Sequence, residues 1–299
     1  MDIAILWPLV QDHITLDWHK TTAIGGIPYY CGQAASRLWV KVTAYATYAA
    51  SDDAWIRSQF PGVTIYPCFC ENTLHFSRSY QSQTPDICDT VEVNYTNNHL
   101  DISRYVSDLS RHEIIILWPL FYDNILPRDV KRIRDIAPNT KIIYWNFGIF
   151  HYPEDHNMTR FDHPESFMEI LPWIDMLFLD QTEAQFVTQT KSIDEAIYIF
   201  QQYSHLTTII TKGSQGSIII TWYDTIEIPA YPPHAIADPT GAWDTYLAAF
   251  LVSEKFYTDL YQRGCFAAMA ATISIERRGA FSWTQEDIED RLRTSNMVS

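Results

Sequence analysis

The order of hydrophobic runs and helical patterns predicts an α/β fold built on a mostly parallel sheet. Short apolar runs at Ile114–Trp118, Lys141–Trp145 and Met176–Leu179 indicate buried strands, because strands of a parallel sheet are covered on both faces. Helical patterns at Pro127–Ile136 and Pro164–Leu171 lie between them, and each begins with a proline that suits a first helical turn. Alternation of strand and helix along a chain predicts helices on both faces of the sheet.

The N-terminal third is expected to hold further strands. Residues 3–10 are an almost unbroken apolar run and predict the first buried strand, with Asp12 in the turn beyond its carboxyl end. Open α/β sheets bind ligands at that edge, although Asp12 is equally compatible with a plain turn residue. Gly25 and Gly26 precede a helix rich in small residues, where glycines let the backbone approach a ligand closely.

Composition limits the classes of function. The chain has 299 residues, 47% of them apolar, which is enough for one large domain with a sizeable core, and we expect a single domain over residues 1–299. A formal net charge of -15 argues against nucleic acid or an anionic membrane as a partner. We see no signal peptide and no transmembrane run, and the five scattered cysteines indicate free thiols. A cytoplasmic location is therefore expected.

The stretch from Asp238 to Glu254 carries the strongest chemical signal. Pro and Gly interrupt the backbone first, and a helix follows, which we expect to start near Gly241. The first N–H groups of that helix, from Gly241 through Ala242 and Trp243 to Asp244, form a site for an anion such as phosphate. Asp244 would stay ionised there and take a proton from a hydroxyl that attacks a phosphoryl group. The alternative is that Asp244 is only a favourable acid in a first helical turn.

This stretch resembles the Asp-Thr-x-Gly-Ala-Gly-Asp signature of the ribokinase-like (PfkB-type) carbohydrate and nucleoside kinases. The chain shares Asp238, Thr240, Gly241, Ala242 and Asp244 with that signature, whereas Trp243 replaces a glycine. Three further partial motifs follow the family's order over nearly the whole chain. The resemblance implies a three-layer α/β/α sandwich with a mostly parallel central sheet and a small β lid. Lid strands are expected near residues 13–24 and 72–95.

On the acceptor side, the resemblance implies that Asp12 binds substrate hydroxyls and that the N–H groups of Gly25 and Gly26 face the acceptor. Family members often place an asparagine a few residues after the two glycines, in contact with the substrate. This chain offers only Tyr30 or Gln33 there, which leaves the acceptor open.

On the donor side, the resemblance assigns a turn after a strand to the nucleotide phosphates, on the match of Thr211, Gly213 and Gly216. Asp180 replaces the asparagine of an Asn-x-x-Glu motif, whose glutamate helps to place Mg²⁺ and is Glu183 here. The same pair also fits a helix cap, and both interpretations are compatible.

Gly279 belongs to the loop that borders the adenine pocket in the family, and a monovalent cation near Asp238 is a further expectation of the resemblance. The implied activity is an ATP- and Mg²⁺-dependent kinase that acts on a hydroxyl of a sugar, a polyol such as inositol, or a nucleoside. The alternative is a catalytically impaired member that binds nucleotide or polyol as a regulatory or binding module. We expect a monomer or a homodimer.

Overall fold

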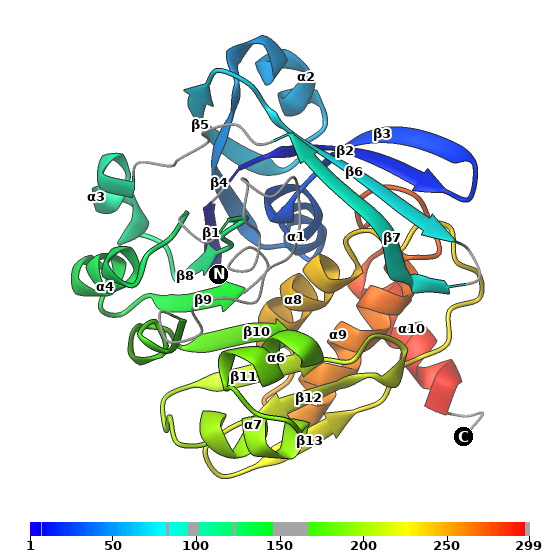
Figure 1. Cartoon of the computed structure of the whole chain (residues 1–299). Coiled ribbons are helices and arrows are strands. Elements are labelled where there is room, and N and C mark those ends of the chain that lie inside the picture. Colours follow the sequence, from blue (N-terminus) through cyan, green and yellow to red (C-terminus); the bar gives the residue numbers. More distant parts are fainter. Residues whose placement is uncertain (7, 82–83, 95–101, 122–123, 146–166, 297–299) are drawn as a thin grey trace.

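Two β-sheets organise the chain (Figure 1). The computed structural model describes residues 1–299 except 7, 82–83, 95–101, 122–123, 146–166 and 297–299. The strands of the larger sheet are β1 (Asp2–Leu6), β4 (Lys41–Ala49), β5 (Val63–Cys70), β8 (Ile114–Leu117), β9 (Lys141–Trp145), β10 (Met176–Asp180), β11 (Thr207–Thr211), β12 (Ser217–Ile220) and β13 (Thr225–Ile228). They lie side by side in the order β13-β12-β11-β10-β9-β8-β1-β4-β5.

The larger sheet is parallel from β11 to β5, which confirms the prediction of a mostly parallel sheet. β1 lies in the middle, and its Ile3 pairs with Val42 on one side and Ile114 on the other. Among the strand pairs described in this larger sheet, only β11–β12 and β12–β13 are antiparallel. The sequence interpretation did not include β13, a strand of only four residues, two of which are exposed.

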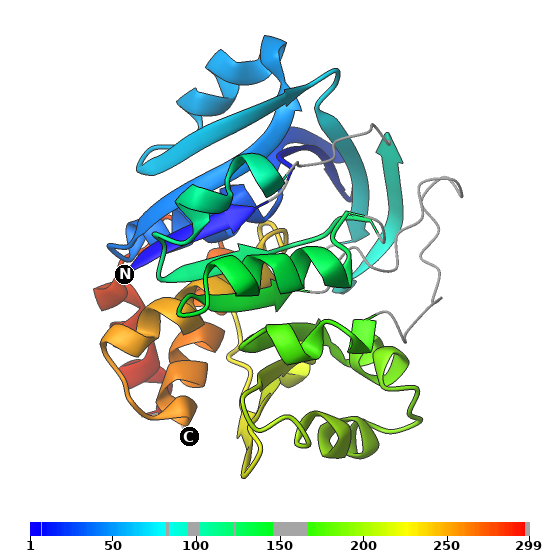
Figure 2. The same cartoon turned by 90° about the vertical axis from the view of Figure 1, so that its left-hand side faces the viewer.

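Helices cover both faces of this sheet. They are α1 (Ile27–Arg37), α2 (Asp53–Ser58), α3 (Val106–Leu109), α4 (Pro127–Ile136), α6 (Gln181–Val187), α7 (Ile193–Phe200), α8 (Ala242–Val252), α9 (Leu260–Ser274) and α10 (Gln285–Asn296). Successive residues of β1 contribute to two separate cores, Ile3 and Ile5 to one, Ala4 and Leu6 to the other. The first core contains α1, α8 and α9, and the second contains α4, α6 and α7. In Figure 2 the orange and red helices lie on one side of the molecule and the green helices on the other.

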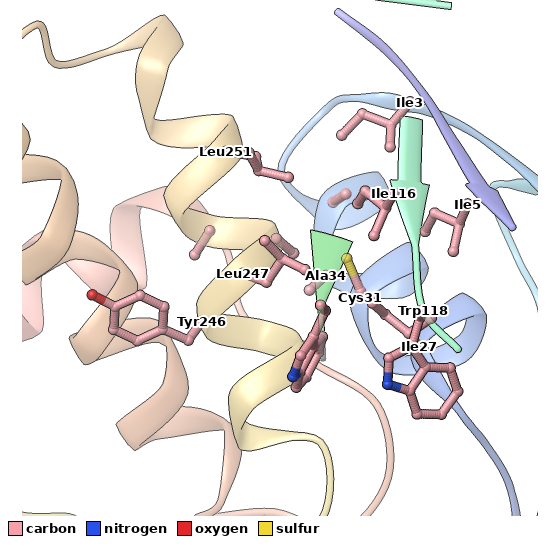
Figure 3. Close-up of a cluster of buried hydrophobic side chains, with 14 of the residues drawn as sticks. Ile3, Ile5, Ile27, Cys31, Ala34, Ile116, Trp118, Tyr246, Leu247 and Leu251 are labelled. Atoms are coloured by element: carbon pink, nitrogen blue, oxygen red, sulfur yellow. The ribbon is translucent and has the colours of Figure 1, made fainter. Parts of the chain in front are cut away.

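The two helices closest to the centre of the first core pack directly on each other. Cys31 and Ala34 of α1 meet Leu247 and Leu251 of α8, beside Ile116 of β8 (Figure 3). All five side chains are fully buried. Small residues on α1 bring the two helix backbones close, so the N-terminal ends of α1 and α8 lie near each other.

The smaller sheet forms the predicted lid. It contains β2 (Val10–Leu16), β3 (His19–Gly25), β6 (Leu74–Gln81) and β7 (Thr84–Asn94), in the order β3-β2-β6-β7. One prediction about the N-terminal part is wrong. The apolar run over residues 3–10 is not one strand, because β1 ends at Leu6 and β2, which belongs to the smaller sheet, begins at Val10. Residues 13–24 form most of the β2–β3 hairpin of the lid, and Asp17 turns the chain with φ 56°.

No helix among the described residues combines the length and hydrophobicity needed to cross a bilayer. The predicted helix over Pro164–Leu171 lies partly outside the described residues.

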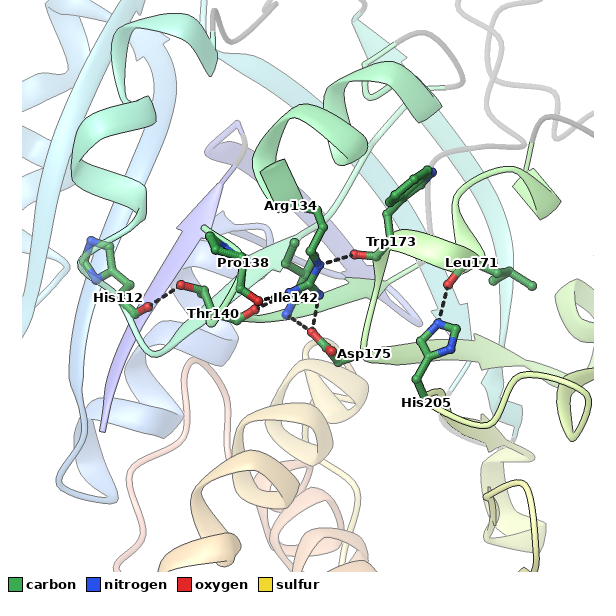
Figure 4. A network of polar contacts seen from close by, with 9 residues as sticks. All are labelled: His112, Arg134, Pro138, Thr140, Ile142, Leu171, Trp173, Asp175 and His205. Atoms are coloured by element: carbon green, nitrogen blue, oxygen red, sulfur yellow. Dashed lines mark hydrogen bonds and ion pairs between the residues drawn. The ribbon is translucent and has the colours of Figure 1, made fainter. Parts of the chain in front are cut away.

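One arginine ties α4 to the edge of the sheet below it (Figure 4). Arg134 donates hydrogen bonds to the backbone carbonyls of Trp173, Pro138 and Thr140, and it forms an ion pair with Asp175. Asp175 in turn accepts the N–H of Ile142 at 2.7 Å. A single planar guanidinium thus joins α4 to the starts of β9 and β10.

We predict that Arg134→Met lowers the free energy of unfolding by about 2 kcal/mol, because several carbonyls and one carboxylate lose a charged donor that is only partly screened by water. Urea unfolding followed by circular dichroism measures this loss. Arg132→Met, at an exposed position of the same helix, is the control and should change stability by less than about 0.5 kcal/mol. Equal losses in both variants would contradict the assigned role of Arg134.

Candidate active site

The N-terminus of α8 is shaped to receive an anion. Its N-cap residue, Gly241, has a left-handed conformation with φ 80°, and no side chain of the described residues caps the helix. A Cβ at Gly241 would lie 2.3 Å from Cδ1 of Tyr30, so only glycine fits this turn. The helix is 11 residues long, and its dipole and first N–H groups attract negative charge. The expected helix start is confirmed, and the anion site at Gly241–Asp244 stays a prediction.

Asp244 lies in the first turn of α8, at the contact with α1. Burial raises the pKa of the Cys31 thiol well above its usual range, and the nearby negative charge of Asp244 raises it further. Cys31 therefore remains a neutral thiol beside the carboxylate. Trp243, the residue before Asp244, is 40% exposed. Its indole is therefore not part of the buried layer between the helices.

The loop before α8 is anchored to the end of α9. The N–H groups of Ala237 and Asp238 both donate to the carbonyl of Ile275. Burial raises the pKa of Asp238, while hydrogen bonds from Thr240 and from the backbone of Gly279 lower it. Gly279 thus lies against the loop that leads into α8. It has φ 87°, and a Cβ at this residue would meet nothing within 4 Å, so the backbone is open on that side.

The acceptor side brings together Asp12, Gly25 and Gly26, as expected, but places Asp12 differently. Asp12 lies within the lid strand β2, not in a turn after β1, and it is 1% exposed. A Cβ at Gly25 would lie 1.6 Å from Oδ2 of Asp12, so the carboxylate occupies the space that a side chain at this residue would need. Gly26 caps α1 with φ 85°, and a Cβ there would lie 3.2 Å from the ring of Trp118.

Trp118 was missed by the sequence interpretation. Trp118 directly follows β8, at the carboxyl edge where parallel sheets bind ligands, and this position in the sequence is a signal for a residue near a site.

The two candidates for the missing asparagine have different environments. Gln33 is 4% exposed and donates its side-chain amide to the carbonyl of Gln59, so it serves the packing of α1. Tyr30 lies against Gly241 instead. The lid histidine His75 pairs with His13, with 3.4 Å between ring nitrogens, on the lid face opposite to Asp12. The two imidazole rings also stack, with 5.6 Å between centroids, so His75 has a structural partner within the lid.

The donor side gathers at the carboxyl ends of β10 and β11. Asp180 and Thr211 are register partners there, and the Thr211 hydroxyl donates to the carbonyl of Leu179. The turn after Thr211 contains Gly213 with φ 56° and Gly216 with φ 91°. A Cβ at Gly216 would lie 2.1 Å from the carbonyl oxygen of Ile228, so packing alone requires a glycine at this position.

Asp180 and Glu183 form the capping box of α6. The Glu183 carboxylate accepts the N–H of Asp180 at 2.8 Å, and the Asp180 carboxylate accepts the N–H of Glu183 at 2.7 Å. Burial raises the pKa of Glu183 well above its usual value, and the negative charge of Asp180 raises it further. Burial also raises the pKa of Asp180. The helix-cap interpretation is therefore confirmed, and two carboxylates remain close together at the donor edge.

The two carboxylates are of the chemical type that magnesium binds, because Mg²⁺ takes oxygen ligands, often from only one or two carboxylates, and keeps several waters. Among the described residues no group of three or more His, Cys, Asp or Glu side chains could hold a metal ion on its own.

The two sides meet at α8. Ser217, the register partner of Thr211, shares a 2.8 Å hydrogen bond with the hydroxyl of Tyr246 on α8. On the other side, Tyr30 of α1 contacts Gly241. The first turns of α8 therefore lie between the turn that follows Thr211 and the glycines that precede α1.

We predict that Glu183→Gln changes how stability depends on pH. Burial and the charge of Asp180 raise the pKa of Glu183 in the folded state above its usual 4.5. The protonated Glu183 therefore contributes to the free energy of unfolding below pH 4.5, and this contribution is lost as the pH rises through the folded-state pKa. Glutamine keeps an acceptor for the Asp180 N–H and carries no charge. Relative to the variant, the unchanged protein should lose stability as pH rises from 4.5 toward alkaline values.

Urea unfolding midpoints across that pH range measure the effect. Glu195→Gln is the matched control, because Glu195 holds the same position in the capping box of α7 but is exposed. Parallel pH profiles for the unchanged protein and Glu183→Gln would show that burial does not penalise this carboxylate.

Comparisons with known proteins agree with this geometry. A model of the pfkB family of carbohydrate kinases matches residues 113–286, more than half of the chain. A nucleoside kinase from Methanocaldococcus jannaschii is 33% identical over 115 residues. That match covers 38% of this chain and 37% of the relative, so only about a third of the relative's length is compared.

Solved structures match over nearly the whole chain. A pyrophosphate-dependent kinase in the ribokinase family, complexed with a pyrophosphate analog and myo-inositol, superposes with a TM-score of 0.79 at 19% identity, covering 96% of this chain and 99% of that one. Arabidopsis thaliana ribokinase, complexed with ribose and ATP, gives a TM-score of 0.74 at 18% identity, with 97% and 98% covered. At these identities the likeness shows the ribokinase-like fold, with its mostly parallel sheet and separate lid.

Proposed function

Because the chain belongs to the pfkB family of carbohydrate kinases, we propose that it transfers a phosphoryl group from ATP to a hydroxyl of a small sugar, polyol or nucleoside. The observation that carries this proposal is the N-terminus of α8. There Gly241 opens an anion-binding turn, Asp244 lies three residues further on, and the lid with its buried Asp12 lies on the acceptor side.

In the proposed reaction, Asp12 and the N–H groups of Gly25 and Gly26 hold the acceptor. Asp244 accepts the proton of the attacking hydroxyl as the new O–P bond forms and the bond to the donor's leaving oxygen breaks. The N–H groups from Gly241 to Asp244 stabilise the charge on the transferred phosphoryl group. Because these donors belong to the backbone, Trp243 in place of glycine leaves them in position.

On the donor side, Thr211, Gly213 and Gly216 are proposed to contact the phosphates, and Gly279 to border the base. Asp180 and Glu183 are the proposed magnesium site, where the ion would neutralise phosphate charge when bound. A monovalent cation near Asp238 belongs to the same proposal, since this buried carboxylate lies directly before the anion-binding turn.

The acceptor and donor are best identified by direct comparison. One structural neighbour was solved with myo-inositol and a pyrophosphate analog, and another with ribose and ATP. A panel of sugars, inositols and nucleosides, each tested with ATP and with pyrophosphate, separates these possibilities. Transfer from ATP to at least one hydroxyl acceptor supports the proposal, and nucleotide binding without transfer supports a non-catalytic binding protein.

We predict that Asp244→Asn lowers kcat by at least about a hundredfold, the usual scale for a lost general base, while binding of ATP stays nearly unchanged. Steady-state kinetics and calorimetric binding measure the two quantities. Asp287→Asn is the control, because Asp287 is likewise an acid in the first turn of a helix, α10. Unchanged turnover in Asp244→Asn would remove this residue from the mechanism.

We predict that Trp243→Gly changes the preference among acceptors, because an exposed indole beside the base narrows the site or stacks on a flat substrate face. The cost in stability should stay near the roughly 1 kcal/mol of a helical glycine, well below the 3–5 kcal/mol of a truncated buried aromatic. Trp55→Gly, at a helical tryptophan that is 38% exposed, is the control. An unaltered preference would place Trp243 outside the acceptor site.

We predict that Glu183→Gln raises the Mg²⁺ concentration required for half-maximal rate, because one carboxylate that orders metal-bound water is neutralised. Magnesium titrations of the initial rate test this, with Glu195→Gln again as the control. If the magnesium dependence is the same in all three proteins, Glu183 acts only as a helix cap.

A further inference from the structure

The ring of Tyr30 is the surface on which the anion-binding turn rests. Tyr30 belongs to α1 and is 3% exposed. A Cβ on Gly241 would lie 2.3 Å from Cδ1, 2.4 Å from Cγ and 3.0 Å from Cβ of this tyrosine. The ring therefore touches the backbone of the turn itself. It fills the space that a side chain at Gly241 would need, and it supports a left-handed conformation from one side.

The preceding residue, Tyr29, reaches the second loop of the site. Burial raises the pKa of its phenol, and the nearby backbone of Ala280, the neighbour of Gly279, lowers it. Burial likewise raises the pKa of Asp238, at the start of the loop before Gly241, and the nearby backbone of Gly279 lowers it. Two consecutive tyrosines of one helix thus contact both backbone segments that flank the N-terminus of α8.

α1 is itself held firmly at the acceptor end. Its N-cap Gly26 is confined between the carbonyl of Pro8 and the ring of Trp118, each 3.2 Å from where a Cβ would lie. The rings of Tyr29 and Tyr30 also pack edge to face, with 5.1 Å between centroids, and Tyr29 packs in the same way on Phe60 at 5.4 Å. A helix confined in this way cannot shift without disturbing several close contacts, so its position is fixed.

We propose that Tyr30, supported by Tyr29, is a positioning residue that fixes the anion-binding turn at Gly241 relative to the acceptor glycines at the start of α1. The inference rests on the proposed kinase function, and it names the side chain that sets the distance between the two reacting groups. A displacement of about 1 Å between reacting groups can lower a rate by about a hundredfold, so a rigid ring at this contact has a direct effect on turnover.

The alternative role for Tyr30 is contact with the acceptor through its hydroxyl. The two roles differ in the part of the side chain that matters. A positioning role depends on the ring, which touches Gly241, and an acceptor contact depends on the hydroxyl. Variants that remove the hydroxyl alone, or the ring as well, therefore distinguish them.

The test uses Tyr30→Phe, which keeps the ring, and Tyr30→Leu, which removes it. Tyr48→Leu is the matched control, because Tyr48 is a fully buried tyrosine of β4 whose ring packs on Phe69, in another part of the core. For each protein we would measure the urea midpoint, kcat and the acceptor KM, and the dissociation constant of inorganic pyrophosphate by calorimetry, as a probe of the anion-binding turn that needs no turnover.

The proposal expects Tyr30→Leu to lower kcat by about ten- to a hundredfold and to weaken pyrophosphate binding severalfold. Tyr30→Phe should keep kcat within about twofold of the unchanged protein. Tyr48→Leu should lower the free energy of unfolding without lowering kcat. The proposal is overturned if Tyr30→Leu keeps kcat and pyrophosphate affinity, if Tyr48→Leu loses as much kcat, or if Tyr30→Phe raises the acceptor KM as strongly as Tyr30→Leu.

If Tyr30→Leu does not fold, Tyr30→Met replaces it, because it also removes the ring but keeps more of the buried volume. If the unchanged protein transfers no phosphoryl group to any acceptor, the kinase proposal fails by itself. The positioning role is then decided by pyrophosphate binding alone, which must be weaker in Tyr30→Leu and retained in Tyr30→Phe.

Discussion

The packing of α1 on α8 is the contact on which the rest of the site depends. Cys31 and Leu247 lie in its buried centre, and Tyr30 meets Gly241 at its N-terminal end. This contact fixes the anion-binding end of one helix against the helix that follows the acceptor glycines. If α1 moved, the turn at Gly241 would lose the surface that supports its left-handed conformation, and Asp244 in the first turn of α8, the proposed base, would move with it.

This arrangement removes several carboxylates from water, which is energetically unfavourable. Asp12 lies within the lid strand β2, Asp238 in the loop before α8 and the Asp180–Glu183 pair at the start of α6, and burial raises the pKa of the last three. Protein interiors rarely tolerate such groups without hydrogen bonds, ligands or ions to offset the loss of water.

Much of this organisation was predictable from local sequence, because it depends on residues with special backbone requirements. Pro239 and Gly241 predicted the helix start, and apolar runs such as Lys141–Trp145 predicted the parallel strands. Asp12 was assigned to a turn because an apolar run shows no internal boundary where a chain passes from one sheet to another. The contacts of Tyr30 and Trp118 with glycine backbones join distant parts of the chain, and no local pattern reveals them.

The central claim is that the N-terminus of α8 receives the phosphoryl group beside Asp244. A crystal structure with a non-hydrolysable ATP analogue, Mg²⁺ and an accepted substrate tests it most directly. We predict that the terminal phosphate lies on the N–H groups of Gly241–Asp244 and that the acceptor hydroxyl lies about 3 Å from the Asp244 carboxylate. A phosphate bound elsewhere, with the indole of Trp243 covering the helix end, would contradict the account.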